Sequence, residues 1–344
     1  MLNSSKFNFW DKLLCKKQYI KKIIDELNFK LTFAIHLFQM KKILTITFLF
    51  VLIHIGTIAI ATNSKLPTIS NDSIRPFIYT GFEKLYNFEF KSTDSCIQQL
   101  KKDYGYSSWT YILEANYFWW KIISGEKNDT YINSFYGSLD NAKKYVNRLN
   151  SDEKKFLSIL IYSFQARVDL MDEKYLNTIV ELKKHIHIIK TTFEKEDSYH
   201  AYYLTSGLYY YLTSVAYSNY SLLRSIMFFM PKGDKLKGIR FLNKKSGDIV
   251  LETESQYFLM KIFDEVEHRD DLSIKYASVL CKKYTQNFIF QEQYYKLLAR
   301  TRKAPLTSNE LRNTKKTILR NKQLSKAQQN YFINITKKLL ACDS

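Results

Sequence analysis

Apolar residues recur three or four positions apart along most of the chain after residue 76, and polar residues occupy the positions between them. In residues 108–124, Trp109, Ile112, Leu113 and Trp120 follow this spacing, which places them on one face of a helix. The pattern therefore predicts a succession of helices joined by short polar turns. The predicted helices are residues 77–88, 92–103, 108–124, 131–149, 153–171, 173–190, 197–220, 222–230, 232–245, 249–268, 271–284, 288–302, 309–323 and 326–341.

The scarcity of glycine and proline supports an all-α fold. The 344 residues include only 9 glycines and 4 prolines, and no proline lies between Phe77 and Met230. A β-rich fold needs many tight turns, which commonly use these two residues. Hydrophobic residues make up 46% of the chain, which is enough for a large core and argues against disorder.

An export segment is predicted near the N-terminus. Two lysines after Met40 precede the apolar residues 43–61, which end in the small residues Ala59 and Ala61. This order of basic, apolar and small residues is typical of a secretory signal peptide. The same 19 residues are also long enough for an uncleaved membrane anchor, with the lysine-rich residues 1–42 in the cytoplasm. Both interpretations place residues 62–344 outside the cytoplasm, in the periplasm or cell envelope.

The domain organisation follows from this segment and from the helical pattern. We expect the native protein to start at Met40, so that residues 1–39 form no part of it. Five ranges result: the extension 1–39, a signal peptide or membrane anchor over 40–61, a linker over 62–75, a helical domain over 76–302 and basic C-terminal helices over 303–344. The four cysteines, Cys15, Cys96, Cys281 and Cys342, form no CxxC pair, which excludes a disulfide framework and a zinc motif.

A recurring pair of residues is the most specific feature of the helical domain. In three predicted helices, an aromatic residue stands four positions before a small one. A small residue lets a neighbouring helix approach closely, and the ring fills the space beside it. The three pairs are Tyr111 and Ala115, Tyr162 and Ala166, and Tyr203 and Gly207.

This spacing resembles the first helix of a tetratricopeptide repeat. The resemblance covers residues 74–302, and segments 113–126 and 229–242 resemble exported bacterial proteins of uncharacterised function. The small residues lie 51 and 41 positions apart rather than 34, so the modules are longer than in that family. The resemblance implies a right-handed α-solenoid of stacked antiparallel helix pairs that binds a protein or peptide partner without enzymatic activity or a cofactor.

Five aromatic residues are candidates for partner binding. Tyr203, Tyr210 and Tyr217 recur every seven residues and should form one stripe on their helix. The stripe either packs in the core or lines a concave groove, where tyrosine is a favourable interface residue. For the adjacent Trp119 and Trp120, we expect one ring to point inward and the other to lie near the surface.

The C-terminal segment is strongly basic. Residues 300–341 contain 11 Lys and Arg residues but a single acid, Glu310. They form either a capping pair of helices with a solvated outer face or a surface for anionic membrane or an anionic envelope polymer. We do not expect nucleic acid binding, because the chain is predicted to be exported. The candidate residues are Lys315, Lys316, Arg320, Lys322, Lys337 and Lys338.

No local motif for catalysis or metal binding emerges. His185 and His187 are two positions apart, so a helix would direct them to different sides. The segment around Asp234 lacks the spacing of a phosphate loop, and we interpret it as a loop before a helix. Ser151 is predicted to cap the helix that follows it. We explain Glu254 only by the favourable interaction of an acid with the start of a helix.

Overall fold

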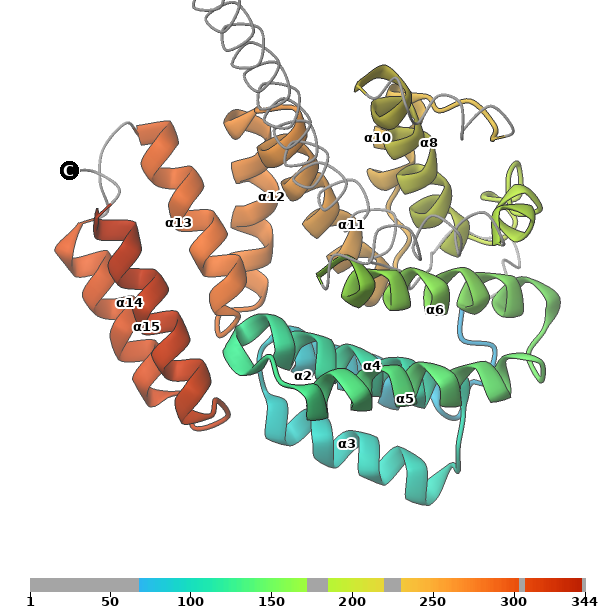
Figure 1. The fold of residues 1–344 in the computed structure, drawn as a ribbon, viewed down its shortest axis with the longest axis horizontal. Coiled ribbons are helices and arrows are strands. Elements are labelled where there is room, and N and C mark those ends of the chain that lie inside the picture. The colour runs from blue at the N-terminus through green and yellow to red at the C-terminus, as the bar shows by residue number, and fades with distance from the viewer. Residues whose placement is uncertain (1–67, 172–184, 220–229, 303–306, 342–344) are drawn as a thin grey trace, which may run out of the picture. The chain divides into compact units, whose positions relative to one another are not determined.

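The computed structural model describes residues 68–171, 185–219, 230–302 and 307–341 (Figure 1). All of them belong to the larger of two units, Thr47–Ser344, whereas the unit Met1–Ile46 and the whole predicted export segment 43–61 lie outside the described residues. Regular secondary structure in these four ranges is helical, and they contain no strand. The predicted all-α class is confirmed. None of the helices in these ranges is both long and apolar enough to cross a membrane.

The helices follow the chain in the order that the periodicity predicts. Before residue 172 they are α2 (Arg75–Tyr86), α3 (Phe90–Asp103), α4 (Ser108–Lys121), the π-helical turn η1 (Ile122–Glu126), α5 (Asp129–Val146) and α6 (Ser151–Met171). After residue 200 they are α8 (Ala201–Asn219), α10 (Lys235–Leu242), α11 (Ile249–Lys261), the π-helical turn η2 (Ile262–Val266), α12 (Asp270–Lys283), α13 (Phe288–Arg302), α14 (Ser308–Arg320) and α15 (Lys326–Ala341). Two predicted helices, 173–190 and 222–230, fall mostly outside the described residues, although 185–190 are helical.

Side-chain caps explain where several helices begin. Ser107, Asn128 and Asp248 each accept hydrogen bonds from backbone N–H groups in the first turn of the helix that follows. Asp234 does the same at the start of α10, which confirms the interpretation of its segment as a loop before a helix. The predicted cap at Ser151 was wrong. That serine is already the first helical residue. The capping side chain is instead that of Asn150, which accepts the N–H of Glu153 at 2.9 Å.

Two small residues bring α8 and α10 close together. A Cβ atom placed on Gly207 would lie 3.0 Å from the side chain of Leu242, and one on Gly238 would lie 2.6 Å from the backbone nitrogen of Tyr211. The predicted role of Gly207, to admit a neighbouring helix, is confirmed. The helix it admits also carries a glycine at the contact, which the spacing analysis did not identify.

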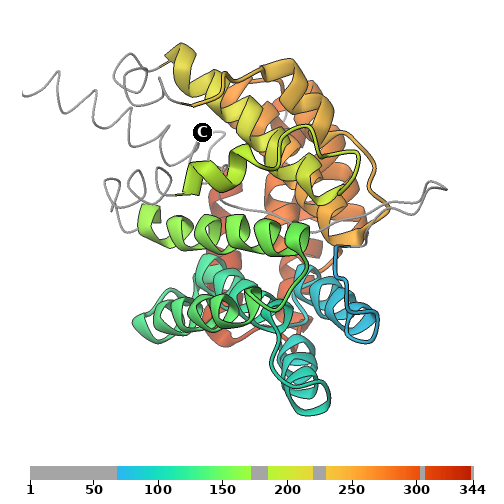
Figure 2. The ribbon, with the colours of Figure 1, turned by 90° about the vertical axis from the view of Figure 1, so that its right-hand side faces the viewer.

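Most consecutive helices pack against one another, and Figure 2 shows α6 between α5 and α8. Contacts between distant segments are added to these. The Tyr86 hydroxyl at the end of α2 hydrogen bonds to the carboxylate of Glu254 in α11, and the Asn287 side chain donates to the Tyr86 carbonyl oxygen at 2.8 Å. In an ideal solenoid, each repeat contacts only its neighbours. The right-handed stacking of helix pairs therefore stays a prediction.

The two π-helical turns follow closely similar helix ends. Tyr-Phe-x-x-Lys-Ile occupies residues 117–122 at the end of α4 and residues 257–262 at the end of α11. In both helices the lysine is the last α-helical residue, and the isoleucine opens the π-helical turn. The apolar spacing predicted single uninterrupted helices over 108–124 and 249–268, and this repeat was not predicted.

Candidate functional site

Most of the aromatic residues proposed for partner binding lie in the core. Tyr203 is 5% exposed and Tyr210 is 9% exposed, and both rings pack near Phe241 of α10. The Tyr203 hydroxyl also accepts a hydrogen bond from the Lys244 ammonium at 3.2 Å. Only Tyr217, near the end of α8, has a largely exposed ring, at 54%. The stripe therefore contributes mainly to the contact between α8 and α10.

The two adjacent tryptophans are both buried, so the expectation of one inward and one surface ring was wrong. Trp119 packs near Phe135 of α5. Trp120 faces another direction and makes edge contacts with Phe88 and Phe290, with ring centroids 5.6 and 5.7 Å apart. Both sides of α4 are covered because α5 packs on one side and the turn between α2 and α3, together with α13, packs on the other.

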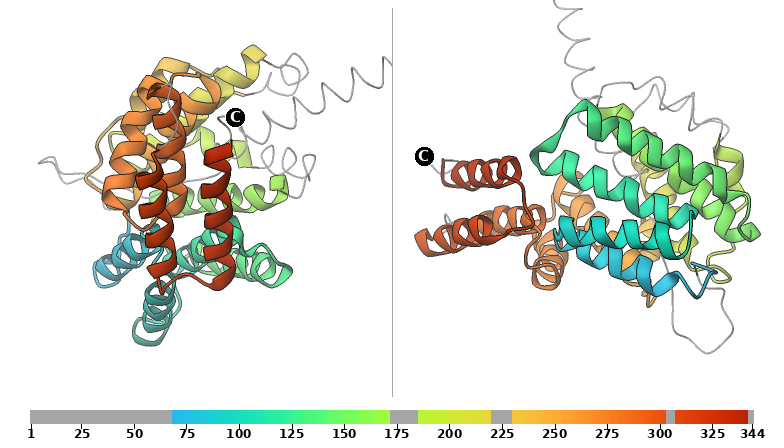
Figure 3. Two further views of the ribbon diagram at one scale, coloured as in Figure 1. Left: turned by 90° about the vertical axis from the view of Figure 1, so that its left-hand side faces the viewer. Right: turned by 90° about the horizontal axis from the view of Figure 1, so that it is seen from below.

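The basic residues, in contrast, lie on an exposed element. We call α14, α15 and the turn between them, residues 307–341, the basic hairpin; Figure 3 shows its two helices side by side at one edge of the described fold. A reciprocal cap starts α14: Thr307 accepts the N–H of Glu310, and the Glu310 carboxylate accepts the N–H of Thr307 at 2.7 Å. These hydrogen bonds to the anion are the main reason that the pKa of Glu310 is lowered, with Arg302 at 3.0 Å adding to the effect.

The hairpin is attached to the fold mainly through α15. Phe332 is fully buried between Phe88 and Phe288, with ring centroids 5.7 and 5.4 Å away. Beside it, the Gln328 side chain donates a buried hydrogen bond to the Ser124 hydroxyl of η1 at 2.7 Å. The anchored helix thus holds α14 as an outer layer.

The outer face of α14 combines positive charge with one exposed leucine. Its inner face is formed by Thr314 and Ile318, both buried. The opposite face carries Leu319, which is 50% exposed, among cations that form no ion pair with any of the described acids. The exposed cations of the hairpin are Arg312, Lys315, Lys316, Arg320, Lys322, Lys326 and Lys337. The side chain of the remaining candidate, Lys338, lies outside the described part of the chain.

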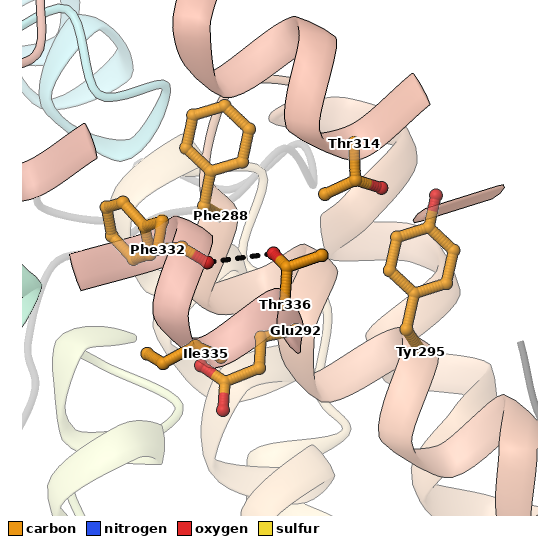
Figure 4. A pocket seen from close by; sticks show the side chains of 7 residues that line it. All are labelled: Phe288, Glu292, Tyr295, Thr314, Phe332, Ile335 and Thr336. Atoms are coloured by element: carbon orange, nitrogen blue, oxygen red, sulfur yellow. Dashed lines mark hydrogen bonds between the residues drawn. The ribbon is translucent and has the colours of Figure 1, made fainter. Parts of the chain in front are cut away.

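A small pocket, open to solvent, lies where the hairpin meets α13 (Figure 4). Phe288, Phe332 and Ile335 form its apolar wall. Its two threonine hydroxyls are already satisfied, because Thr336 donates to the Phe332 carbonyl oxygen at 2.8 Å and Thr314 donates to a carbonyl oxygen of its own helix. The pocket therefore offers little for specific recognition of a small molecule, and the exposed face of the hairpin is the stronger candidate site.

Two buried glutamates were not identified from the sequence as structural residues. Glu153 is fully buried and accepts the indole N–H of Trp109 at 2.6 Å; burial raises the pKa of this carboxyl despite that hydrogen bond. Glu254 is buried beneath Tyr86. Both residues stand near helix starts, where acids are common for electrostatic reasons, so the sequence contained no signal of their burial.

Comparison with known proteins adds no assignment: no protein-family model, curated protein or solved structure matches the chain. The resemblance to tetratricopeptide repeats therefore stays a prediction from the sequence. Of the described cysteines, Cys96 and Cys281 are free. Among the described residues, no three His, Cys, Asp or Glu side chains are arranged to hold a metal ion.

Proposed function

We propose that this protein is a non-enzymatic helical scaffold of the cell envelope, which attaches to an anionic membrane surface through the basic hairpin and presents its other helices to a protein or peptide partner. The observation that carries the proposal is the outer face of α14, where unpaired cations surround the exposed side chain of Leu319. The location outside the cytoplasm rests on the predicted export segment 43–61.

Electrostatics and apolar burial act together on such a face. Each Lys or Arg near an anionic membrane contributes about 1 kcal/mol at physiological salt. Insertion of the exposed half of Leu319 adds about 1 kcal/mol, because full burial of a leucine side chain is worth roughly 1.5–3 kcal/mol. Several exposed cations and one leucine therefore support a reversible attachment, similar to that of an interfacial amphipathic helix.

Vesicle flotation of the full chain tests the proposal. We expect binding to vesicles that contain phosphatidylglycerol and little binding to phosphatidylcholine alone. Replacement of Lys315, Lys316, Arg320 and Lys322 by glutamine should weaken binding to the anionic vesicles by at least about tenfold, since four favourable contributions are lost. The matched control replaces exposed lysines elsewhere with glutamine and removes the same net charge: Lys127, Lys154, Lys190 and Lys195.

Substitution is preferable to deletion of the hairpin, because removal of Phe332 would expose the rings of Phe88 and Phe288. Leu319→Ser distinguishes binding to a membrane from binding to a soluble polyanion such as polyglutamate. We expect it to weaken vesicle binding and to leave polyglutamate binding unchanged. Equal loss of vesicle binding in the control quadruple variant, or no loss in either, would contradict the proposal.

A further inference from the structure

A column of stacked rings stands at the turn between α3 and α4, away from the hairpin. Tyr106 lies on Tyr111 with ring centroids 5.8 Å apart and planes 13° apart, and Tyr111 lies on Tyr145 at 5.9 Å and 22°. The Arg148 guanidinium lies over the Tyr145 ring, 4.8 Å from its centroid. We call these four residues the tyrosine column.

Both ends of the tyrosine column are available for binding. Tyr106 is 58% exposed, and because Tyr111 covers one face of its ring, the other face is open to solvent. Arg148 is also exposed, and no described acid forms an ion pair with it. A guanidinium that stacks on an aromatic ring keeps its N–H groups free to bind a carboxylate in a bidentate manner. Tyrosine and arginine are also the residues that contribute most often to binding energy at protein interfaces.

The charges nearby favour a peptide over a nucleic acid. A single nucleic acid strand needs a groove with several free cations along its phosphates. Here the Lys101 ammonium, 5.2 Å from the Tyr111 centroid, forms an ion pair with Glu114. Of these two cations over rings of the column, Arg148 forms no ion pair with a described acid and can bind one or two carboxylates, which suits an acidic peptide.

We propose that the tyrosine column docks an acidic segment of a partner protein, whose aromatic side chain stacks on Tyr106 while a carboxylate binds Arg148. This inference rests on the proposed scaffold function and names the chemistry of its partner. The length of the column sets the spacing between the two groups. Its spacings of 5.8, 5.9 and 4.8 Å are spanned by about five residues of an extended peptide at about 3.3 Å per residue, so the aromatic and acidic residues should be several positions apart.

Fluorescence polarisation with the full chain and labelled synthetic peptides tests the spacing and the residues. The probe carries one phenylalanine and a glutamate pair about five positions apart in a Gly/Ser background. We expect it to bind, and we expect a peptide with the same residues adjacent, or with glutamine in place of glutamate, to bind at least about tenfold more weakly. Tyr106→Ala and Arg148→Gln should each weaken binding by about tenfold, whereas Tyr106→Phe should retain it.

Leu236→Ala, at an exposed apolar residue of α10, and Lys154→Gln serve as controls and should bind the probe as the native chain does. The inference is overturned if the native chain does not bind the probe. It is also overturned if Tyr106→Ala and Arg148→Gln bind the probe as tightly as the native chain does. So does tighter binding of an oligo-dT strand that the same two substitutions abolish, because the column would then be a nucleic acid site. The glutamine variant of Lys315, Lys316, Arg320 and Lys322 should still bind the peptide, so failure of vesicle binding and failure of peptide binding are distinguishable.

Discussion

The ends of α4 and α11 are alike in sequence, but their backbones differ at the turn that follows and different helices cover them. After the shared Lys-Ile step, η1 continues with Ser124 and Gly125, whereas η2 has Asp264 and Glu265 at the corresponding positions. In both turns, the side chain at the first of these positions accepts a hydrogen bond from a glutamine amide. Ser124 accepts it from Gln328 of α15, and Asp264 accepts it from Gln293 of α13. A π-helical turn at a helix end thus serves as a receiving site for another helix in both halves of the described fold.

The difference lies in how each turn selects its helix. Gly125 has a positive φ of 99°, and a Cβ atom there would lie 2.5 Å from that of Tyr331, so η1 selects α15 by close approach. At η2, Asp264 and Asp270 both bind the guanidinium of Arg300, so that turn selects α13 by charge. Similar local sequences therefore precede both turns, while one or two side chains beyond the repeat decide which distant helix packs on each turn.

Among the variants that test this comparison, Phe332→Ala should cause the largest loss of stability. The ring is buried between Phe88 and Phe288, and removal of such a ring costs about 3–5 kcal/mol of unfolding free energy. Chemical denaturation measures the loss. Leu319→Ala, on the outer face of the same hairpin, should cost less than about 1 kcal/mol, since exposed positions contribute little. A similar cost for both variants would show that α15 is not the anchored helix.

Gly125→Val should have the next largest effect, about 2–3 kcal/mol, because it combines an unfavourable positive φ with overpacking against Tyr331. Gly137→Ala is the matched control, because Gly137 lies within α5 and no heavy atom would lie within 4 Å of the new Cβ. That substitution should stabilise the protein by roughly 0.5–1 kcal/mol. Thermal and chemical denaturation of both variants measure the difference, and a harmless Gly125→Val would mean that close approach does not select α15.

Arg300→Met tests selection by charge at η2. We expect a loss of about 1 kcal/mol: the guanidinium is half exposed and therefore screened, but its removal takes a charged partner from the nearly buried Asp264, which keeps its hydrogen bond from Gln293. The methionine keeps most of the apolar stem, so the comparison isolates the charge. High salt should reduce the difference in stability between the native chain and the variant. Equal salt dependence of the two proteins would argue against an electrostatic contribution of Arg300.

Glu310→Gln should have the smallest effect, and the size of that effect depends on pH. Because the pKa of Glu310 is lower in the folded than in the unfolded chain, its charge stabilises the fold above the unfolded pKa near 4.5. This contribution is lost as pH falls through the folded pKa. Glutamine keeps a capping side chain without the charge, so the variant should be less stable by up to about 0.5 kcal/mol at pH 7 and equal at the lowest pH. Denaturation over this pH range tests it, and a constant difference would contradict the assignment.

The local structure was largely accessible from the sequence. The helices 288–302 and 326–341 were predicted with the observed bounds, because apolar periodicity is strong there. The roles of Gly207 in close packing and of Asp234 as a helix start were also recovered. Both are local effects: a missing Cβ and a side chain that reaches an N–H three residues away.

The functional surfaces were harder to predict. The spacing of Tyr203 and Tyr210 is the same whether the rings line a groove or pack in the core, so only the position of α10 decides between the two. The charge of Lys315 and Lys316 was evident, but their place on the outer face depends on the burial of Thr314 and Ile318. Tyr106, Tyr111 and Tyr145 are spread over almost 40 residues and were not grouped at all, because no periodicity joins residues that meet only in the tertiary structure.

The sequence by itself determined an all-α class, most helix positions and a basic C-terminal segment, because these depend on residues within one or two turns of each other. Tertiary structure alone decided which rings are buried, which helices cover η1 and η2, and where the tyrosine column forms. Those outcomes depend on contacts between residues far apart in the chain, such as Ser124 with Gln328 and Tyr86 with Glu254. Such contacts arise from the arrangement of whole helices, and local spacing contains no record of them.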